Sequence, residues 1–347
     1  MAQAWGWRVL FLANLPLGAL VTAAAYALLP PDRGGRGQGF DLRGFFALSA
    51  FLLVVSASLL GTPGLNNRSA TIGLIGLALL LGIWFAAAER RAAAPLVDLS
   101  AIVRPGVLTA NIGTFFASFI MAGGMFLSVL YGQLLAGTSA AAIGVLLAPY
   151  AVATLAVAPA AGRLSDSLGP RNLAVAGLAG LAVSVALPVL WHPSSAAALV
   201  SSSNLIAGIS LGIAAPALLR ASVEPVPRKH AGVGAGLYKT VSELGGVFGV
   251  VLLGTLLEAR VVANALRQIP DRFLPQPLTL RALTPPGALE TYALQHGLAP
   301  QAAGDFQRTL AAALHRGFDQ VFGIAALLAG LGILAAFLVP RRLGASR

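Results

Sequence analysis

Residues 143–162 form an apolar run without a charged side chain, and the run ends abruptly in a polar segment that carries Arg163, Asp166 and Arg171. A helix of about 20 apolar residues is long enough to cross the ~30 Å hydrocarbon core of a bilayer. The run therefore predicts a membrane-spanning helix that stops at a charged turn, and the rest of the chain must fold around such a helix.

The composition of the whole chain agrees with a polytopic membrane protein. Of its 347 residues, 57% are hydrophobic and only 10% are charged, with a mean hydropathy of +0.82; a soluble domain carries about 25% charged residues. The absence of cysteine excludes disulfides, thiolate metal sites and cysteine nucleophiles. The net charge of +11 is not gathered into basic clusters with interleaved aromatic residues, so we expect no nucleic-acid partner.

Nine apolar runs predict nine membrane spans, and charge predicts their orientation. The runs cover residues 9–29, 44–60, 70–88, 107–131, 141–161, 172–190, 196–219, 232–257 and 317–339. Basic residues accumulate in cytoplasmic loops. When successive short loops are assigned to alternate sides of the membrane, one side holds Arg8 and Arg68. The other side holds fourteen basic residues: Arg33, Arg36, Arg43, Arg90, Arg91, Arg104, Arg163, Arg171, Arg220, Arg228, Lys229, Arg341, Arg342 and Arg347. We expect a multi-pass protein of the cell's inner (plasma) membrane with a cytoplasmic C-terminus and an extracytoplasmic N-terminus.

The polar segment after the first run has the spacing Gly-x-x-x-Asp-x-x-Gly-x-Arg at Gly162, Asp166, Gly169 and Arg171. The glycines allow a tight reversal of the chain. Asp166 can accept hydrogen bonds from amides at the start of the next helix or pair with Arg163 or Arg171. An ordinary solvated turn with capping residues is the alternative. Between two apolar spans, the segment resembles the signature loop of the major facilitator superfamily, which implies a cytoplasmic latch. Ser167 and Pro170 replace the usual basic residues, which implies a weaker one.

A second stretch resembles one branch of that superfamily. Residues 6–18 are similar to the opening of the sixth helix in drug:proton antiporters with fourteen spans, through Trp7, Arg8, Phe11, Asn14, Pro16 and Gly18. The resemblance implies an all-α polytopic membrane protein with the major facilitator fold, comprising the C-terminal six-helix half, built from two inverted three-helix repeats, plus about three preceding helices. It also implies efflux of drugs or other hydrophobic compounds, driven by proton entry.

The same resemblance predicts how the chain is divided. Residues 1–30 are expected to be the last helix of the N-terminal half, and residues 31–100 a linker with two extra transmembrane helices. Residues 101–258 would form the first five helices of the C-terminal half, 259–316 an extracytoplasmic loop, and 317–347 the last helix and a cytoplasmic tail. The first five helices of the family would then be missing, as in a fragment, a truncated gene product or a product with a misplaced start.

Lys239 and Glu243 are the two charged residues well inside the predicted spans. Their i,i+4 spacing places them on one helix face, where they can form an ion pair. Intramembrane ionisable residues usually face a cavity or pathway, so one interpretation is a substrate or proton site. The other is a structural pair in which Lys239 extends to the membrane interface.

Other residues fit a cavity lining or helix packing. Asn111, Tyr131 and Gln133, with nearby Phe and Met residues, resemble the polar and aromatic lining of a drug-binding cavity. For each aromatic or Met residue the alternative is contact with lipid or a neighbouring helix. Two pairs with small-xxx-small spacing predict close helix packing: Gly208 with Gly212, and Gly245 with Gly249.

Enzyme chemistry is not supported by the sequence. The four histidines, His192, His230, His296 and His315, lack metal-ligand spacing, and neither a Walker A nor a Gly-x-Ser-x-Gly sequence is present. We therefore expect a transporter with no metal or cofactor. Its expected partners are the lipid bilayer, a small hydrophobic substrate, protons, and a missing N-terminal half or a partner protein that supplies one. The alternative is a non-transporting membrane scaffold or regulatory fragment that needs a partner half.

Overall fold

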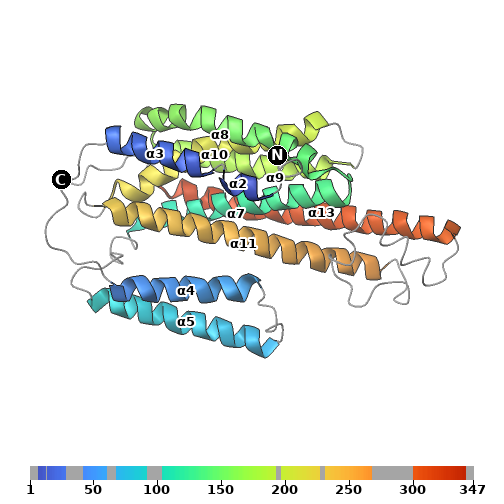
Figure 1. The fold of residues 1–347 in the computed structure, drawn as a ribbon, viewed down its shortest axis with the longest axis horizontal. Coiled ribbons are helices and arrows are strands. Elements are labelled where there is room, and N and C mark those ends of the chain that lie inside the picture. The colour runs from blue at the N-terminus through green and yellow to red at the C-terminus, as the bar shows by residue number, and fades with distance from the viewer. Residues whose placement is uncertain are drawn as a thin grey trace. The chain divides into compact units, whose positions relative to one another are not determined.

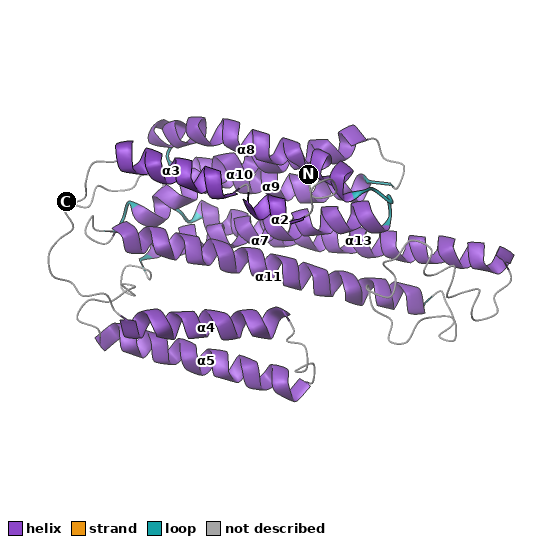
Figure 2. Ribbon diagram, in the orientation of Figure 1, coloured by secondary structure: helices purple, strands orange, loops and turns teal. Residues whose placement is uncertain are grey.

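The described part of the chain is helical, as expected for an all-α membrane protein (Figure 2). The structure is a computed structural model that describes residues 7–12, 14–28, 42–60, 68–91, 104–192, 197–226, 231–267 and 300–340. The chain separates into two units, Met1–Asp41 and Leu42–Arg347. Most of the predicted linker, the loop before Arg68, the centre of the predicted extracytoplasmic loop and the C-terminal tail lie outside the described residues.

The first unit contains two short helices, α2 (Trp7–Leu12) and α3 (Asn14–Leu28), at the position of the first predicted span. In the second unit, α4 (Leu42–Leu60) and α5 (Arg68–Arg91) form a pair that matches the second and third predicted spans (Figure 1). Gly82 of α5 allows this pairing, because a Cβ there would lie 3.2 Å from the Phe51 ring of α4.

Six longer helices make up the rest of the second unit (Figure 1). They are α7 (Pro105–Leu134), α8 (Ala140–Leu168), α9 (Pro170–Ala186) with the 3₁₀ turn η1 (Leu187–Leu190), α10 (Ala197–Val223), α11 (Ala231–Leu266) and α13 (Pro300–Phe337). Each contains a stretch long and apolar enough to cross a membrane, whereas the apolar stretches of α3, α4 and α5 are shorter. The last six predicted spans are therefore confirmed as helices of membrane length.

Local sequence explains where several of these helices start. Pro105 and Pro170 occupy the first turns of α7 and α9, where a missing amide hydrogen costs nothing and the fixed φ suits a helix. Ser139 caps α8, its Oγ accepting a hydrogen bond from the Ala142 amide at 3.3 Å. Gly137, with φ of +58°, supplies the left-handed turn between α7 and α8.

The packing of the six helices has an internal symmetry. Helix α7 packs on α10, α11 and α13, helix α10 also packs on α8 and α9, and α9 packs on α13. Exchanging α7 with α10, α8 with α11, and α9 with α13 turns the α7–α11 pair into α10–α8 and the α7–α13 pair into α10–α9, and it leaves the α7–α10 and α9–α13 pairs unchanged. Such a pattern is that of two three-helix repeats related by a pseudo-two-fold axis.

The bundle buries aromatic and aliphatic side chains inside and shows aliphatic side chains outside. Its largest fully buried residues include Trp191, Phe318, Phe322 and Leu127. On the outer faces, Leu155 of α8 is 79% exposed, and many other aliphatic residues of the same helices are exposed as well. Apolar surface of this extent is rare on soluble monomers, and a surrounding bilayer accounts for it.

Two helices extend beyond the predicted span limits. The predicted loop at residues 259–316 is helical at both ends, because α11 continues to Leu266 and α13 begins at Pro300. Polar residues in these stretches, such as His315, face other helices in part rather than water alone. The two helices therefore continue past the predicted span limits at residues 257 and 317.

Candidate functional site

One end of the bundle, which we call the latch end, is tied together by three arginines. Arg220 of α10 forms an ion pair with Asp166 of α8, and its Nε lies 2.7 Å from Oε2 of Glu224. Arg171 Nε at the start of α9 donates to the Val339 carbonyl at 2.5 Å, and Arg104 Nη1 donates to the Pro225 carbonyl at 2.9 Å. These contacts join α8 to α10, α9 to the end of α13, and α7 to the end of α10.

The latch end corrects two details of the predicted turn. Helix α8 continues to Leu168, so Gly162, Arg163 and Asp166 are helical and only Gly169 lies between the helices. Asp166 pairs with Arg220, which the motif spacing does not predict, rather than with Arg163 or Arg171. Arg220 and Glu224 are recognisable in the sequence as an i,i+4 pair at the end of an apolar run. Asp166, which pairs with Arg220, lies 54 residues earlier in the chain.

A cavity of about 440 Å³ lies among the ends of the helices opposite the latch end. Its lining is mainly aliphatic and comes from α7, α8 and α10 and from the residues after η1. The polar groups on it include Ser128, Tyr131, Thr138, His192 and Asn204. A cavity of 300–1,000 Å³ with a mostly apolar wall and a few polar groups is typical of small-molecule sites. We call it the open-end cavity.

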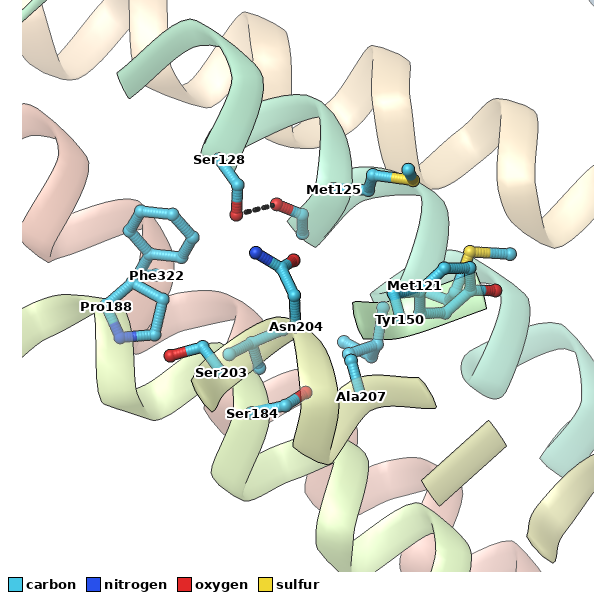
Figure 3. A pocket seen from close by; sticks show the side chains of 13 residues that line it. Met121, Met125, Ser128, Tyr150, Ser184, Pro188, Ser203, Asn204, Ala207 and Phe322 are labelled. Carbon is cyan, nitrogen blue, oxygen red and sulfur yellow. Dashed lines mark hydrogen bonds between the residues drawn. The ribbon is translucent and has the colours of Figure 1, made fainter. Parts of the chain in front are cut away.

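A smaller hollow of about 30 Å³ lies deeper among α7, α8, α9, α10 and α13 (Figure 3). Ser128 and Asn204 line both hollows, so the two are adjacent. Figure 3 shows the side chain of Asn204 directed toward Ser128, with Met121, Met125 and Tyr150 on one side of it. The sequence alone did not predict Ser128, Tyr150 and Asn204 as a group, because their shared position depends on how three separate helices pack.

The predicted lining residues do not form one site. Asn111 is buried near the latch end of α7 and donates from Nδ2 to the Val107 carbonyl at 2.9 Å. Tyr131 is buried at the other end of the same helix, about 30 Å away along a helix, and lines the open-end cavity. Gln133 is exposed just beyond it. The three residues therefore belong to different environments.

Lys239 and Glu243 form the ion pair that their spacing suggested, with Nζ 2.5 Å from Oε1. Their side chains are 71% and 66% exposed, so the described helices do not bury them. The pair lies in the first half of α11, and neither of the two cavities among the described helices is lined by either residue. A pathway role and a structural role both remain proposals for this pair.

The four packing glycines lie at two helix crossings. A Cβ on Gly245 or Gly249 of α11 would come within 3.0 Å of the carbonyl carbons of Phe115 and Phe119 on α7. A Cβ on Gly208 of α10 would lie 2.9 Å from the Tyr150 carbonyl carbon of α8, and one on Gly212 would lie 3.2 Å from the Thr154 carbonyl oxygen. At both crossings, the backbones are close enough that a side chain would collide with a carbonyl group.

Residues 1–250 match the model of the Major Facilitator Superfamily. The chain belongs to this superfamily. Its members are transporters and not enzymes, and the described residues contain no group of three potential metal ligands. The predicted membership of the major facilitator superfamily is thereby confirmed.

Relatives of this superfamily member include named resistance and export proteins. The Tetracenomycin C resistance and export protein of Streptomyces glaucescens is 26% identical over 97% of the chain and 62% of its own length. Multidrug resistance protein Stp of Mycobacterium tuberculosis is 26% identical over 82% of the chain and 52% of its own length. The Probable actinorhodin transporter of Streptomyces coelicolor is 29% identical over 77% and 47%. The chain spans about half to three fifths of these relatives.

The two glycines of the loop motif are expected to respond in opposite ways to alanine. Gly169 has φ of +77° and ψ of 153°, a region that only glycine adopts readily, so Gly169→Ala should destabilise the protein by about 1–3 kcal/mol. Gly162 is helical, and an added Cβ would meet nothing within 4 Å, so Gly162→Ala should stabilise by about 0.5–1 kcal/mol. Thermal unfolding in detergent measures both, and equal effects of the two changes would contradict the assigned backbone.

Proposed function

We propose that this chain takes part in proton-coupled export of hydrophobic compounds, in the manner of the fourteen-span drug:proton antiporters, with α7–α13 as one half of the transporter. The open-end cavity carries the proposal: a site of drug size opens at one end of the six-helix bundle, while ion pairs and hydrogen bonds close the other end. A transporter that alternates between two sides needs such a difference between its ends. Relatives named for tetracenomycin C resistance and export and for multidrug resistance support a role in drug export.

The proposal includes a second set of helices. Alternating access rocks one half against another around a shared site, and the chain matches about half to three fifths of its relatives. We infer that export requires the complementary helices, whether from the same polypeptide or from a partner. The scaffold or regulatory alternative is favoured only if the chain binds no transported compound.

The orientation is also part of the proposal, with the latch end in the cytoplasm. Arg104, Arg163, Arg171 and Arg220 lie at or near this end, as the distribution of basic residues predicts. Because the chain has no cysteine, a single one can be introduced cleanly. We expect Gln133→Cys to react with a membrane-impermeant maleimide in intact cells and Ser167→Cys to react only after permeabilisation. Reversed labelling would overturn the orientation.

Filling the open-end cavity is expected to weaken binding of a hydrophobic cation. Leu146 of α8 lines the cavity, so Leu146→Trp should lower the affinity of the purified chain for ethidium by about ten-fold or more, since a lost apolar fit is worth about 1–3 kcal/mol. Ethidium fluorescence anisotropy measures the affinity.

The matched control is Leu155→Trp on the same helix, which places the same ring on an exposed outer face. It should bind ethidium like the native chain. Equal affinities for native chain and Leu146→Trp, or the absence of binding by the native chain, would contradict the assignment of this cavity.

A further inference from the structure

A cluster of partly buried polar groups and buried aromatic rings lies beside the open-end cavity. His315 Nδ1 and Asp319 Oδ2 of α13 lie 3.0 Å apart. The rings of Tyr131 and His315 lie 6.1 Å apart, and those of Tyr131 and Trp191 lie 5.4 Å apart. The cluster joins α7, α13 and the residue after η1, and Tyr131 and Trp191 also line the cavity.

Four buried polar atoms of the cluster have no hydrogen-bond partner among the described residues. They are Tyr131 Oη, Trp191 Nε1, His315 Nε2 and Asp319 Oδ1. Buried polar groups are normally paired, and an unpaired one costs free energy. Because a carboxylate only accepts hydrogen bonds, His315 Nδ1 must be the donor in the pair, which leaves Nε2 as the ring atom able to take up a proton.

We propose that the His315–Asp319 pair is a proton-binding site at the open end of the bundle. With a neutral imidazole, the pair carries one negative charge. Uptake of one proton at Nε2 gives an imidazolium beside a carboxylate, and the net charge becomes zero. A neutral pair suits apolar surroundings better than a single charge does. The open-end cavity lies beside the pair, because His192 lines the cavity and the His192 and His315 rings lie 5.5 Å apart.

Other charged and titratable groups near the pair come from α13, α11, α7 and the segment after η1. Arg316 follows His315 on α13. Helix α11 packs beside this part of α13, since Gly317 lies against Val261 and Asn264 Nδ2 donates to the Ala313 carbonyl. Glu258 and Arg260 of α11 therefore lie at about the same height along the bundle as the His315–Asp319 pair. The remaining groups are Tyr131 from α7 and His192 after η1. The 3.0 Å contact of His315 Nδ1 with Asp319 Oδ2, together with the unpaired His315 Nε2, is the geometry on which the assignment rests.

A role of the His315–Asp319 pair in coupling proton entry to export rests on the proposed function. Protonation of the pair can be tested without measuring transport. The chain has four tryptophans. Changing Trp5, Trp7 and Trp84 to Phe leaves Trp191 as the reporter, fully buried and in edge contact with Tyr131. We expect Trp191 emission of the purified chain to change reversibly when the pH is lowered from about 8 to about 5.

Two variants of the pair and two neighbouring controls decide the assignment. His315→Gln should abolish the emission change. Asp319→Asn, which keeps the shape but removes the charge, should displace its midpoint by about half a pH unit or more. His192→Gln and Glu258→Gln should leave the change in place.

Three results would overturn the proposal: a change that survives His315→Gln, a change that His192→Gln abolishes, or no change in the native background. A midpoint unaffected by Asp319→Asn would exclude the carboxylate from the site. Emission at pH 8 and helical content by circular dichroism identify any variant that has not folded. If either His315→Gln or Asp319→Asn does not fold, the other variant decides the assignment. Ethidium binding is measured separately, so failure of the export proposal and failure of this one are distinguished.

Discussion

Replacing Gly249 by alanine is expected to lower both the stability of the bundle and the yield of folded protein. The added Cβ would lie 2.9 Å from the Phe119 carbonyl carbon and even closer to its oxygen, and carbonyl groups inside a helix cannot move aside as side chains do. Helices α7 and α11 would have to separate, and overpacking of this kind costs about 1–3 kcal/mol. Gly123 of α7 lies against Gly249, and a Cβ at Gly123 would also collide with the α11 backbone. Neither helix can therefore take a larger side chain at this crossing.

The measurement is thermal unfolding of the purified chain in detergent, together with the fraction recovered as monodisperse protein. Gly236→Ala on the same helix is the matched control, because nothing lies within 4 Å of a Cβ at that position. Its unfolding temperature should stay the same or rise. If Gly249→Ala and Gly236→Ala behave alike, α7 and α11 are not in close backbone contact, and the assigned packing of the bundle is wrong.

Breaking the pair between Asp166 and Arg220 is expected to impair export while leaving stability nearly unchanged. The Arg220 side chain is 33% exposed and that of Asp166 is 71% exposed, and exposed ion pairs contribute little to stability. The pair does, however, join α8 to α10 at the end that must open and close. Asp166→Asn should therefore lower the export rate by about 5- to 150-fold, the usual range of coupling between conformational states.

The reversed pair, Asp166→Arg with Arg220→Asp, is expected to recover a large part of the rate lost in Asp166→Asn. Glu224→Gln serves as the control, because it removes the second carboxylate near Arg220 but leaves Asp166 in place. Export of ethidium from loaded cells that also contain the complementary helices is the measurement. An unimpaired Asp166→Asn variant, or a reversed pair that is no better than the single change, would show that this contact is not a latch.

Much of the fold could be predicted from the sequence, because a helix needs about 20 apolar residues to cross the bilayer. Apolar runs of that length therefore indicate the spans. Six predicted spans correspond to α7–α13, and their bounds differ most where charged residues enter the helices. Helix α8 includes Asp166 because Arg220 of another helix pairs with it. Helix α13 begins well before the predicted span at residues 317–339, since α7 and the segment after η1 pack against His315.

The candidate site could be predicted only in part, for a similar reason. The motif spacing identified Asp166 and Arg171, yet their partners, Arg220 and the Val339 carbonyl, lie 54 and 168 residues away. Glycine spacing predicted close packing without identifying the partner helices. Ser128 and Asn204, or Tyr131 and Trp191, come together through the crossing of separate helices, and no local pattern in the chain shows that arrangement.

Proton-driven accumulation of ethidium is the measurement that tests the central proposal most directly. Inside-out vesicles would be prepared from cells that contain the chain with the complementary helices of a relative, and from cells that contain either part alone. We predict accumulation only when both parts are present and the vesicle interior is acidic, with complete loss on addition of a protonophore. Accumulation that persists without the pH gradient, or none above that of vesicles lacking the chain, would contradict proton-coupled export by this bundle.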